Sequence, residues 1–112
     1  MYYPKIYQKF IKRYPDLFES FKALGHQCRN AGPIPEKYQN LIKLGIAIGG
    51  DSRGAVMSGT RKALQSGASP EEIFHTVLLS LTTTGFPNMM GAMALVDEVI
   101  RSTSIDGREK DR

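Results

Sequence analysis

The chain has 112 residues, 41% of them hydrophobic, which is enough for one domain with a modest core. Its net charge of +4 is scattered without a dense basic patch or a nucleic-acid-binding motif, so we expect no nucleic-acid partner. No apolar run approaches the roughly 18 residues of a membrane span, and residues 1–15 lack the pattern of a targeting signal. We therefore predict a cytoplasmic protein with no membrane partner, and its single cysteine suits that compartment.

The N-terminal third predicts two helices, a short one over 5–13 and a longer one over 15–30 that ends before a Gly-Pro pair. Cys28 lies at helical spacing from apolar residues of the second helix. We therefore expect Cys28 to be buried in an apolar face rather than to act as a redox group. One cysteine also cannot form an intrachain disulfide.

Two further helices are predicted over 35–48 and 52–66, separated by a Gly-Gly pair. The second carries small residues three or four positions apart, which places them on one face and lets another backbone come near. Glycine inside a helix costs about 1 kcal/mol relative to alanine, so Gly59 indicates either close packing or a vacated site. The stripe consists of Ser52, Ala55, Gly59, Ala63 and Ser66.

The strongest helix start is Ser69-Pro70-Glu71-Glu72, because Ser69 and Glu72 have the spacing of a capping box and Pro70 suits the first helical position. This helix is predicted over 70–84, and its apolar residues on more than one side suggest burial between helices or against another subunit. Asn88 is expected to cap a last helix. We predict one helical domain over 1–104 and a charged, disordered tail over 105–112.

Four segments carry a resemblance to a known family: YPDLFESFKAL, GPIPEKYQNLIKLGIAI, ALQSGASPEEI and TTTGFPNMMGAMALVDEVI. Together they run from about Tyr14 to Ile100. They resemble the carboxymuconolactone decarboxylase family, which also contains the AhpD-like alkylhydroperoxidases. The resemblance implies an all-α, AhpD-like bundle of five to six helices that assembles into dimers, trimers or hexamers.

The residues that the family uses for chemistry are absent. In the peroxidase branch, the resemblance implies a Cys-x-x-Cys pair at Ser52 and Ala55, a histidine at Gly59 and a glutamate at Asn40. The decarboxylase branch would also have its histidine at Gly59. None of these residue types is present, and serine cannot replace a thiolate and its resolving thiol at neutral pH.

If the family's scaffold is kept, the resemblance places a pocket on the motif helix and the helix before it. Arg53 and Lys43 are the charged residues expected beside it. His26 and His75 have no metal-ligand spacing to a Cys, Asp or Glu, so we expect no metal site and no cofactor. The pocket candidates are Asn40, Lys43, Ser52, Arg53, Ala55, Val56, Met57 and Gly59.

Three functional hypotheses follow, and the sequence leaves open whether the protein is an enzyme. The first is a degenerate homologue without dithiol peroxidase activity that binds a small molecule or a partner. The second is a family enzyme, decarboxylase-like or a peroxiredoxin-type oxidoreductase, that acts on a small anionic substrate through non-standard residues such as Arg53. The third is a peroxidase that uses Cys28 alone. The first is favoured because the motif is missing.

Overall fold

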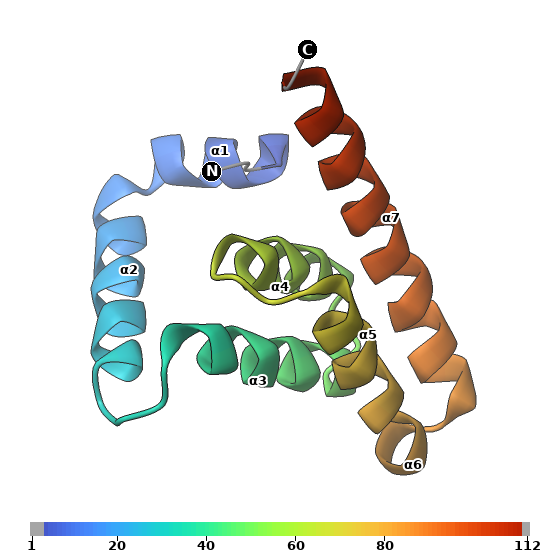
Figure 1. Ribbon diagram of the computed structural model, residues 1–112. Coiled ribbons are helices and arrows are strands. Elements are labelled where there is room, and N and C mark those ends of the chain that lie inside the picture. The colour runs from blue at the N-terminus through green and yellow to red at the C-terminus, as the bar shows by residue number, and fades with distance from the viewer. Residues whose placement is uncertain (1–3, 111–112) are drawn as a thin grey trace. The chain divides into compact units, whose positions relative to one another are not determined.

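The structure is a computed structural model that describes residues 4–110, and those residues form helices without a strand (Figure 1). The all-α class predicted from the sequence is thus confirmed. Contacts within the chain define two compact units, Met1–Pro33 and Ile34–Arg112. The single-domain boundary at residue 104 stays a prediction. No helix of the described part is long and apolar enough to cross a bilayer.

The first unit contains α1 (Lys5–Arg13) and α2 (Pro15–Arg29), with bounds close to those predicted. An aromatic cluster joins the two helices: the Tyr7 and Phe18 rings meet edge to face with centroids 5.9 Å apart. The Lys22 ammonium lies over the Phe18 ring, 5.5 Å from its centroid. Phe18 is the buried residue of α2, so this contact is the core of the unit.

The prediction that Cys28 is buried is wrong, because the structure places its thiol on an exposed part of α2. Its apolar neighbours Phe21 and Leu24 are 62% and 57% exposed. The reason is the place at which α1 contacts α2. α1 has 9 residues against 15 in α2, and its ring contact is with Phe18, near the start of α2. Helical spacing correctly grouped these residues on a face but could not show what covers it.

The second unit is built from α3 (Glu36–Gly49), α4 (Arg53–Gln65), α5 (Pro70–Leu79), α6 (Leu81–Thr84) and α7 (Phe86–Lys110). α3 and α4 pack on one another as a helical pair, and α7 packs against α4, α5 and α6 (Figure 1). Apolar side chains from all four longer helices meet between them. The most deeply buried are Leu44, Ile48, Val56, Ala63, Ile73, Val77 and Val96.

The start of α5 confirms the predicted capping box. The Glu72 backbone N–H donates to Ser69 Oγ at 3.1 Å, and the Ser69 backbone N–H donates to Glu72 Oε1 at 2.9 Å. Gly67 ends the preceding helix with φ of 96°, a conformation that glycine adopts without the cost of a Cβ.

The predicted helix over 70–84 is interrupted at Ser80, which separates α5 from α6. The prediction that Asn88 caps the last helix is wrong. α7 begins at Phe86, and the Met89 backbone N–H donates to the Gly85 carbonyl at 3.1 Å. Pro87 therefore lies in the first turn, where its missing N–H needs no partner. α7 also continues to Lys110, into the segment predicted as a disordered tail, while residues 111–112 lie outside the described part.

Candidate functional site

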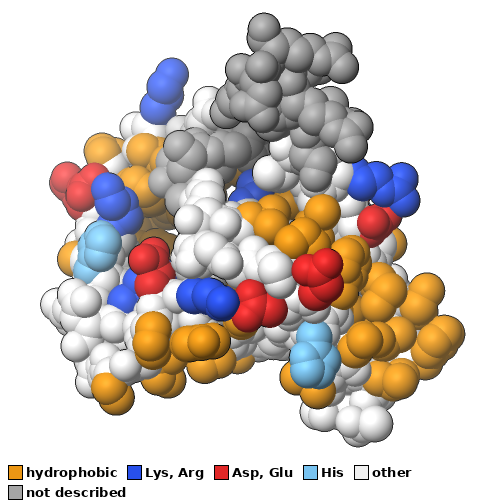
Figure 2. Space-filling view, in the orientation of Figure 1, with side chains coloured by type: hydrophobic (Ala, Val, Ile, Leu, Met, Phe, Trp, Pro, Cys, Tyr) orange, Lys and Arg blue, Asp and Glu red, His pale blue; other side chains and the backbone are white. Residues whose placement is uncertain are grey.

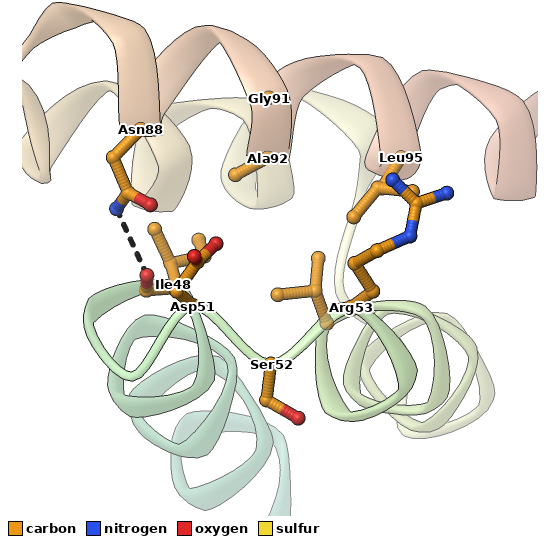
Figure 3. Close-up of a pocket in the computed structure, with 9 residues that line it drawn as sticks. Ile48, Asp51, Ser52, Arg53, Asn88, Gly91, Ala92 and Leu95 are labelled. Carbon is orange, nitrogen blue, oxygen red and sulfur yellow. Dashed lines mark hydrogen bonds between the residues drawn. The ribbon is translucent and has the colours of Figure 1, made fainter.

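A pocket of about 120 Å³ lies where the turn between α3 and α4 faces α7 (Figure 3). Its inner wall is apolar and comes from three helices. Its rim is polar and comes mainly from the turn. The lining residues are Ile48, Asp51, Ser52, Arg53, Val56, Asn88, Gly91, Ala92 and Leu95.

The wall belongs to the core of the second unit. Ile48, Val56, Ala92 and Leu95 are all buried, with 1 to 8% of their surface exposed. These side chains are held by packing between α3, α4 and α7. The pocket is therefore a depression in a packed core, and its shape is fixed by the helices rather than by a long loop.

The turn positions the polar rim. The Asp51 backbone N–H donates to the Ile48 carbonyl at 3.1 Å, and the Ser52 N–H donates to the Ala47 carbonyl at 3.2 Å. These bonds end α3 and hold Asp51 at a φ of 52°, which few non-glycine residues adopt. Ser52 then caps α4, because its Oγ accepts from the Ala55 N–H at 3.3 Å. Its hydroxyl consequently points away from α7 (Figure 3).

Two opposite charges face this pocket from different ends. The Asp51 carboxylate lies on the side of Asn88, and the Arg53 side chain extends beside Leu95 (Figure 3). Among the described residues neither group forms an ion pair. Arg53 is moreover the first residue of α4, whose first turn contains no acidic residue. The positive end of the helix dipole and the guanidinium thus act in the same direction and favour a bound anion.

Asn88 closes the pocket at the other helix. Its Nδ2 donates to the Ile48 carbonyl at 2.9 Å and to Thr84 Oγ1 at 3.0 Å. This side chain thereby fixes the start of α7 against the end of α3. The Asn88 bonds use both amide hydrogens and leave Oδ1 for another donor.

Gly91 is the other notable residue of the α7 wall. A Cβ built at Gly91 would meet nothing within 4 Å, so no packing contact requires glycine there. Glycine in a helix interior destabilises it by about 0.5–1 kcal/mol relative to alanine. Gly91 is exposed and borders the pocket.

A comparison with protein-family models adds one finding. The model of the carboxymuconolactone decarboxylase family matches residues 15–98. The chain belongs to the carboxymuconolactone decarboxylase family. A comparison with curated proteins gave no match. The family match covers α2 to the first half of α7, so it includes every residue that lines the pocket.

In this carboxymuconolactone decarboxylase family member, the positions aligned above with the peroxidase motif have structural roles. Ser52 caps α4 and Ala55 donates to that cap. Asn40 is buried, with its Nδ2 donating to Ser66 Oγ at 2.9 Å and to the Lys62 carbonyl at 3.3 Å. These bonds join α3 to the end of α4.

The surroundings of Gly59 decide between the two interpretations that the sequence allowed, close packing and a vacated site. A Cβ at Gly59 would lie 3.5 Å from the Cα and Cδ1 atoms of Leu44, so α3 occupies the space beside it. The contact favours close packing over a vacated site at this position.

The structure brings only some of the predicted pocket residues together. Ser52, Arg53 and Val56 line the pocket. Lys43 and Ala55 are exposed elsewhere, and Met57 packs against the core. The sequence analysis did not predict the pocket residues of α7, because these lie more than thirty positions after the lining residues of α4. They are Asn88, Gly91, Ala92 and Leu95. The sequence signal that could have found them is Gly91, a glycine inside an otherwise continuous helical pattern.

Proposed function

We propose that this member of the carboxymuconolactone decarboxylase family lacks dithiol peroxidase chemistry and binds a small anionic molecule in the pocket between the α3–α4 turn and α7. The observation that carries the proposal is Arg53, whose guanidinium lines a pocket at a helix N-terminus without an ion-pair partner among the described residues. Such a site combines a fixed positive charge with apolar walls, which is the usual composition of a small-ligand site.

The lining residues favour binding over catalysis. They include no cysteine or histidine, so the pocket offers neither a thiol nucleophile nor an imidazole base. The one hydroxyl is that of Ser52, which accepts the capping bond and points away from α7 (Figure 3). No cluster of three potential metal ligands occurs in the part of the chain that the structure describes.

The test adds a side chain at the border of the pocket without a clash against neighbouring residues. Gly91→Leu places a side chain where a Cβ meets no neighbour, and we expect it to abolish the thermal shift given by small carboxylates. The matched control is Gly25→Leu on α2, where a Cβ also meets nothing and which does not line the pocket. Unchanged carboxylate binding in Gly91→Leu would overturn the proposal, because a bound ligand must stabilise the protein in proportion to its occupancy.

The alternative is a family enzyme acting on a small anionic substrate through non-standard residues, with decarboxylase-like or peroxiredoxin-type chemistry. The same observation supports it, because Arg53 lines the pocket and forms no ion pair with another described residue. Incubation with lactone carboxylates, followed by product analysis, distinguishes the two. Turnover that disappears in Arg53→Gln would establish the enzyme, whereas binding without turnover supports the degenerate homologue.

We also propose that the protein is a homo-oligomer. The second unit exposes large apolar side chains along α3 and α5, among them Ile46 at 68% and Leu79 at 64%. Between these helices runs an apolar groove of about 430 Å³ that Ile42 and Leu79 help to line. Figure 2 shows hydrophobic side chains gathered over the α5–α6 region and the start of α7. Contiguous apolar surface of this kind is typical of subunit interfaces.

Light scattering coupled to size exclusion tests the assembly. We expect a mass above that of one chain, reduced in Leu79→Glu but unchanged in His75→Glu, which alters an exposed residue of the same helix outside the groove. A monomer at micromolar concentration would contradict the proposal.

A further inference from the structure

We infer that the pocket takes a bipolar small molecule, with a cationic amine at the Asp51 end and an anionic group at the Arg53 end, as in an ω-amino acid. The inference rests on the proposed function, because it names the ligand class of the same site. It goes further in assigning a role to Asp51 and Asn88, which the binding of a simple anion would not use.

The first observation is the arrangement of the two charges. Asp51 and Arg53 are two residues apart, yet their side chains enter the pocket from opposite ends (Figure 3). Neither is neutralised by another charged side chain of the described part. A simple anion would pair with Arg53, but its negative charge would lie near the negative carboxylate of Asp51 and be repelled by it. A ligand with both charges satisfies both residues.

The second observation is the fixed orientation of the Asn88 amide. Thr84 Oγ1 donates its one hydrogen to the Ser80 carbonyl at 3.0 Å, so toward Asn88 it can only accept. The Ile48 carbonyl is also an acceptor. Both partners therefore require the NH₂ group of Asn88 on their side. The oxygen Oδ1 is left on the pocket side, near Asp51 (Figure 3).

These two acceptors belong to the same end of the pocket. A carboxylate and an amide oxygen together match the N–H donors of an ammonium group, which has three to offer. The opposite end carries the guanidinium and the N-terminus of α4, whose first turn lacks an acidic residue. The pocket is thus divided into an acceptor end and a donor end.

The third observation is the size and polarity of the space between these ends. The buried side chains of Ile48, Val56, Ala92 and Leu95 form an apolar wall there. A volume of about 120 Å³ corresponds to roughly four water molecules and is well below the ~300 Å³ of the smallest drug-sized sites. A short methylene chain with a charge at each end fits these limits.

The test compares probes with the same number of carbon atoms that carry one or both charges: 4-aminobutyrate, butyrate and butylamine. Each is titrated into ¹⁵N-labelled full-length protein, and binding is followed through the Asn88 side-chain amide and the Gly91 backbone N–H, both at the pocket. We expect 4-aminobutyrate to bind about two- to fivefold more tightly than either singly charged probe, the range for one exposed charge pair.

Substitutions of Asp51 and Arg53 test the acceptor end and the donor end of the pocket separately. Asp51→Asn should weaken 4-aminobutyrate and butylamine by about two- to fivefold and leave butyrate unchanged or tighter. Arg53→Gln should weaken 4-aminobutyrate and butyrate and spare butylamine. Lys43→Gln removes an exposed charge from α3 outside the pocket and should preserve the ranking of the three probes. Asn is among the residues that tolerate a positive φ, and Asp51→Gly repeats the test with the residue best suited to a φ of 52°.

The outcomes distinguish the inference from the proposed function. Butyrate binding as tightly as 4-aminobutyrate, with the same ranking in Asp51→Asn and Asp51→Gly, would overturn the inference and leave an anion site. Absence of binding by all three probes would overturn both. Loss of the two-charge preference in both Asp51 variants, with butyrate binding kept, would establish the acceptor end.

Discussion

The side-chain amide of Asn88, near the start of α7, donates to the carbonyl of Ile48, near the end of α3, at 2.9 Å. The two residues are forty positions apart, and their bond joins helix ends that both border the pocket. It also provides a donor to one of the last carbonyls of α3, which have no hydrogen-bond donor within their own helix. One contact therefore supports both the fold of the second unit and the shape of the site.

Asn88→Asp should destabilise the protein, because it keeps the shape of the side chain and replaces the donating NH₂ by an acceptor. Losing this hydrogen bond should cost about 0.5–1.5 kcal/mol, because the Ile48 carbonyl keeps the bond from the Asp51 backbone N–H. Urea unfolding at neutral pH measures the effect. Asn30→Asp is the matched control, since Asn30 is exposed and its change should cost far less. Equal effects of the two variants would show that the Asn88 bond contributes little.

Gly59 tests the close approach of α4 to α3. Gly59→Ala should be neutral or stabilising by up to ~1 kcal/mol, because alanine favours the helix and its Cβ would meet Leu44 at ordinary contact distances of 3.5 to 3.7 Å. Gly59→Phe should destabilise by about 1–3 kcal/mol or more, because its ring has no space beside Leu44.

Gly54→Phe provides the control for Gly59→Phe. It lies on the same helix, but a Cβ there meets nothing within 4 Å, so thermal unfolding should change little. A stable Gly59→Phe protein that loses ligand binding would instead show that a cavity exists at Gly59.

The ion pair between Lys37 and Glu72, with Nζ and Oε2 3.0 Å apart, predicts a pH dependence of stability. The Ser69 backbone N–H first, and the Lys37 ammonium second, hold the pKa of Glu72 below its ordinary value of 4.5. A carboxylate with a lowered pKa stabilises the fold above its unfolded-state pKa, and this contribution is lost as pH falls through the folded-state pKa.

Glu72→Gln keeps an acceptor for the capping bond but removes the charge. We expect the difference in unfolding free energy between wild type and Glu72→Gln to be full near neutral pH and to shrink as pH falls below about 4.5. Glu71→Gln is the control, because Glu71 lies in the same first turn of α5 and forms no ion pair with another described residue. A difference independent of pH would mean that the Glu72 charge makes no contribution.

Cys28 is exposed, so its thiol should react with a thiol reagent in the folded protein, at one group per chain. Peroxide turnover in a coupled assay should nevertheless stay near background, because no second cysteine is present to resolve an oxidised thiol. Cys28→Ser should leave that background unchanged. Sustained turnover that disappears in Cys28→Ser would establish the single-cysteine peroxidase.

The sequence by itself determined most of the local structure and the family. Helical periodicity placed α1 to α4 within one or two residues, and Ser69, Pro70 and Glu72 identified the start of α5, because caps and periodicity depend on residues a few positions apart. It also showed that the motif thiols and histidine are missing. These are properties of residue type and spacing alone.

Tertiary structure decided which faces are covered and which residues share a site. Cys28 has helical spacing to apolar residues, yet α1 contacts α2 near Phe18 and leaves Cys28 exposed. Asn88 has the chemistry of a cap, yet it bonds a carbonyl forty positions away. Gly59 could have marked a cavity, but Leu44 fills the space. In each case the outcome depends on long-range packing between helices, and local spacing does not specify that packing.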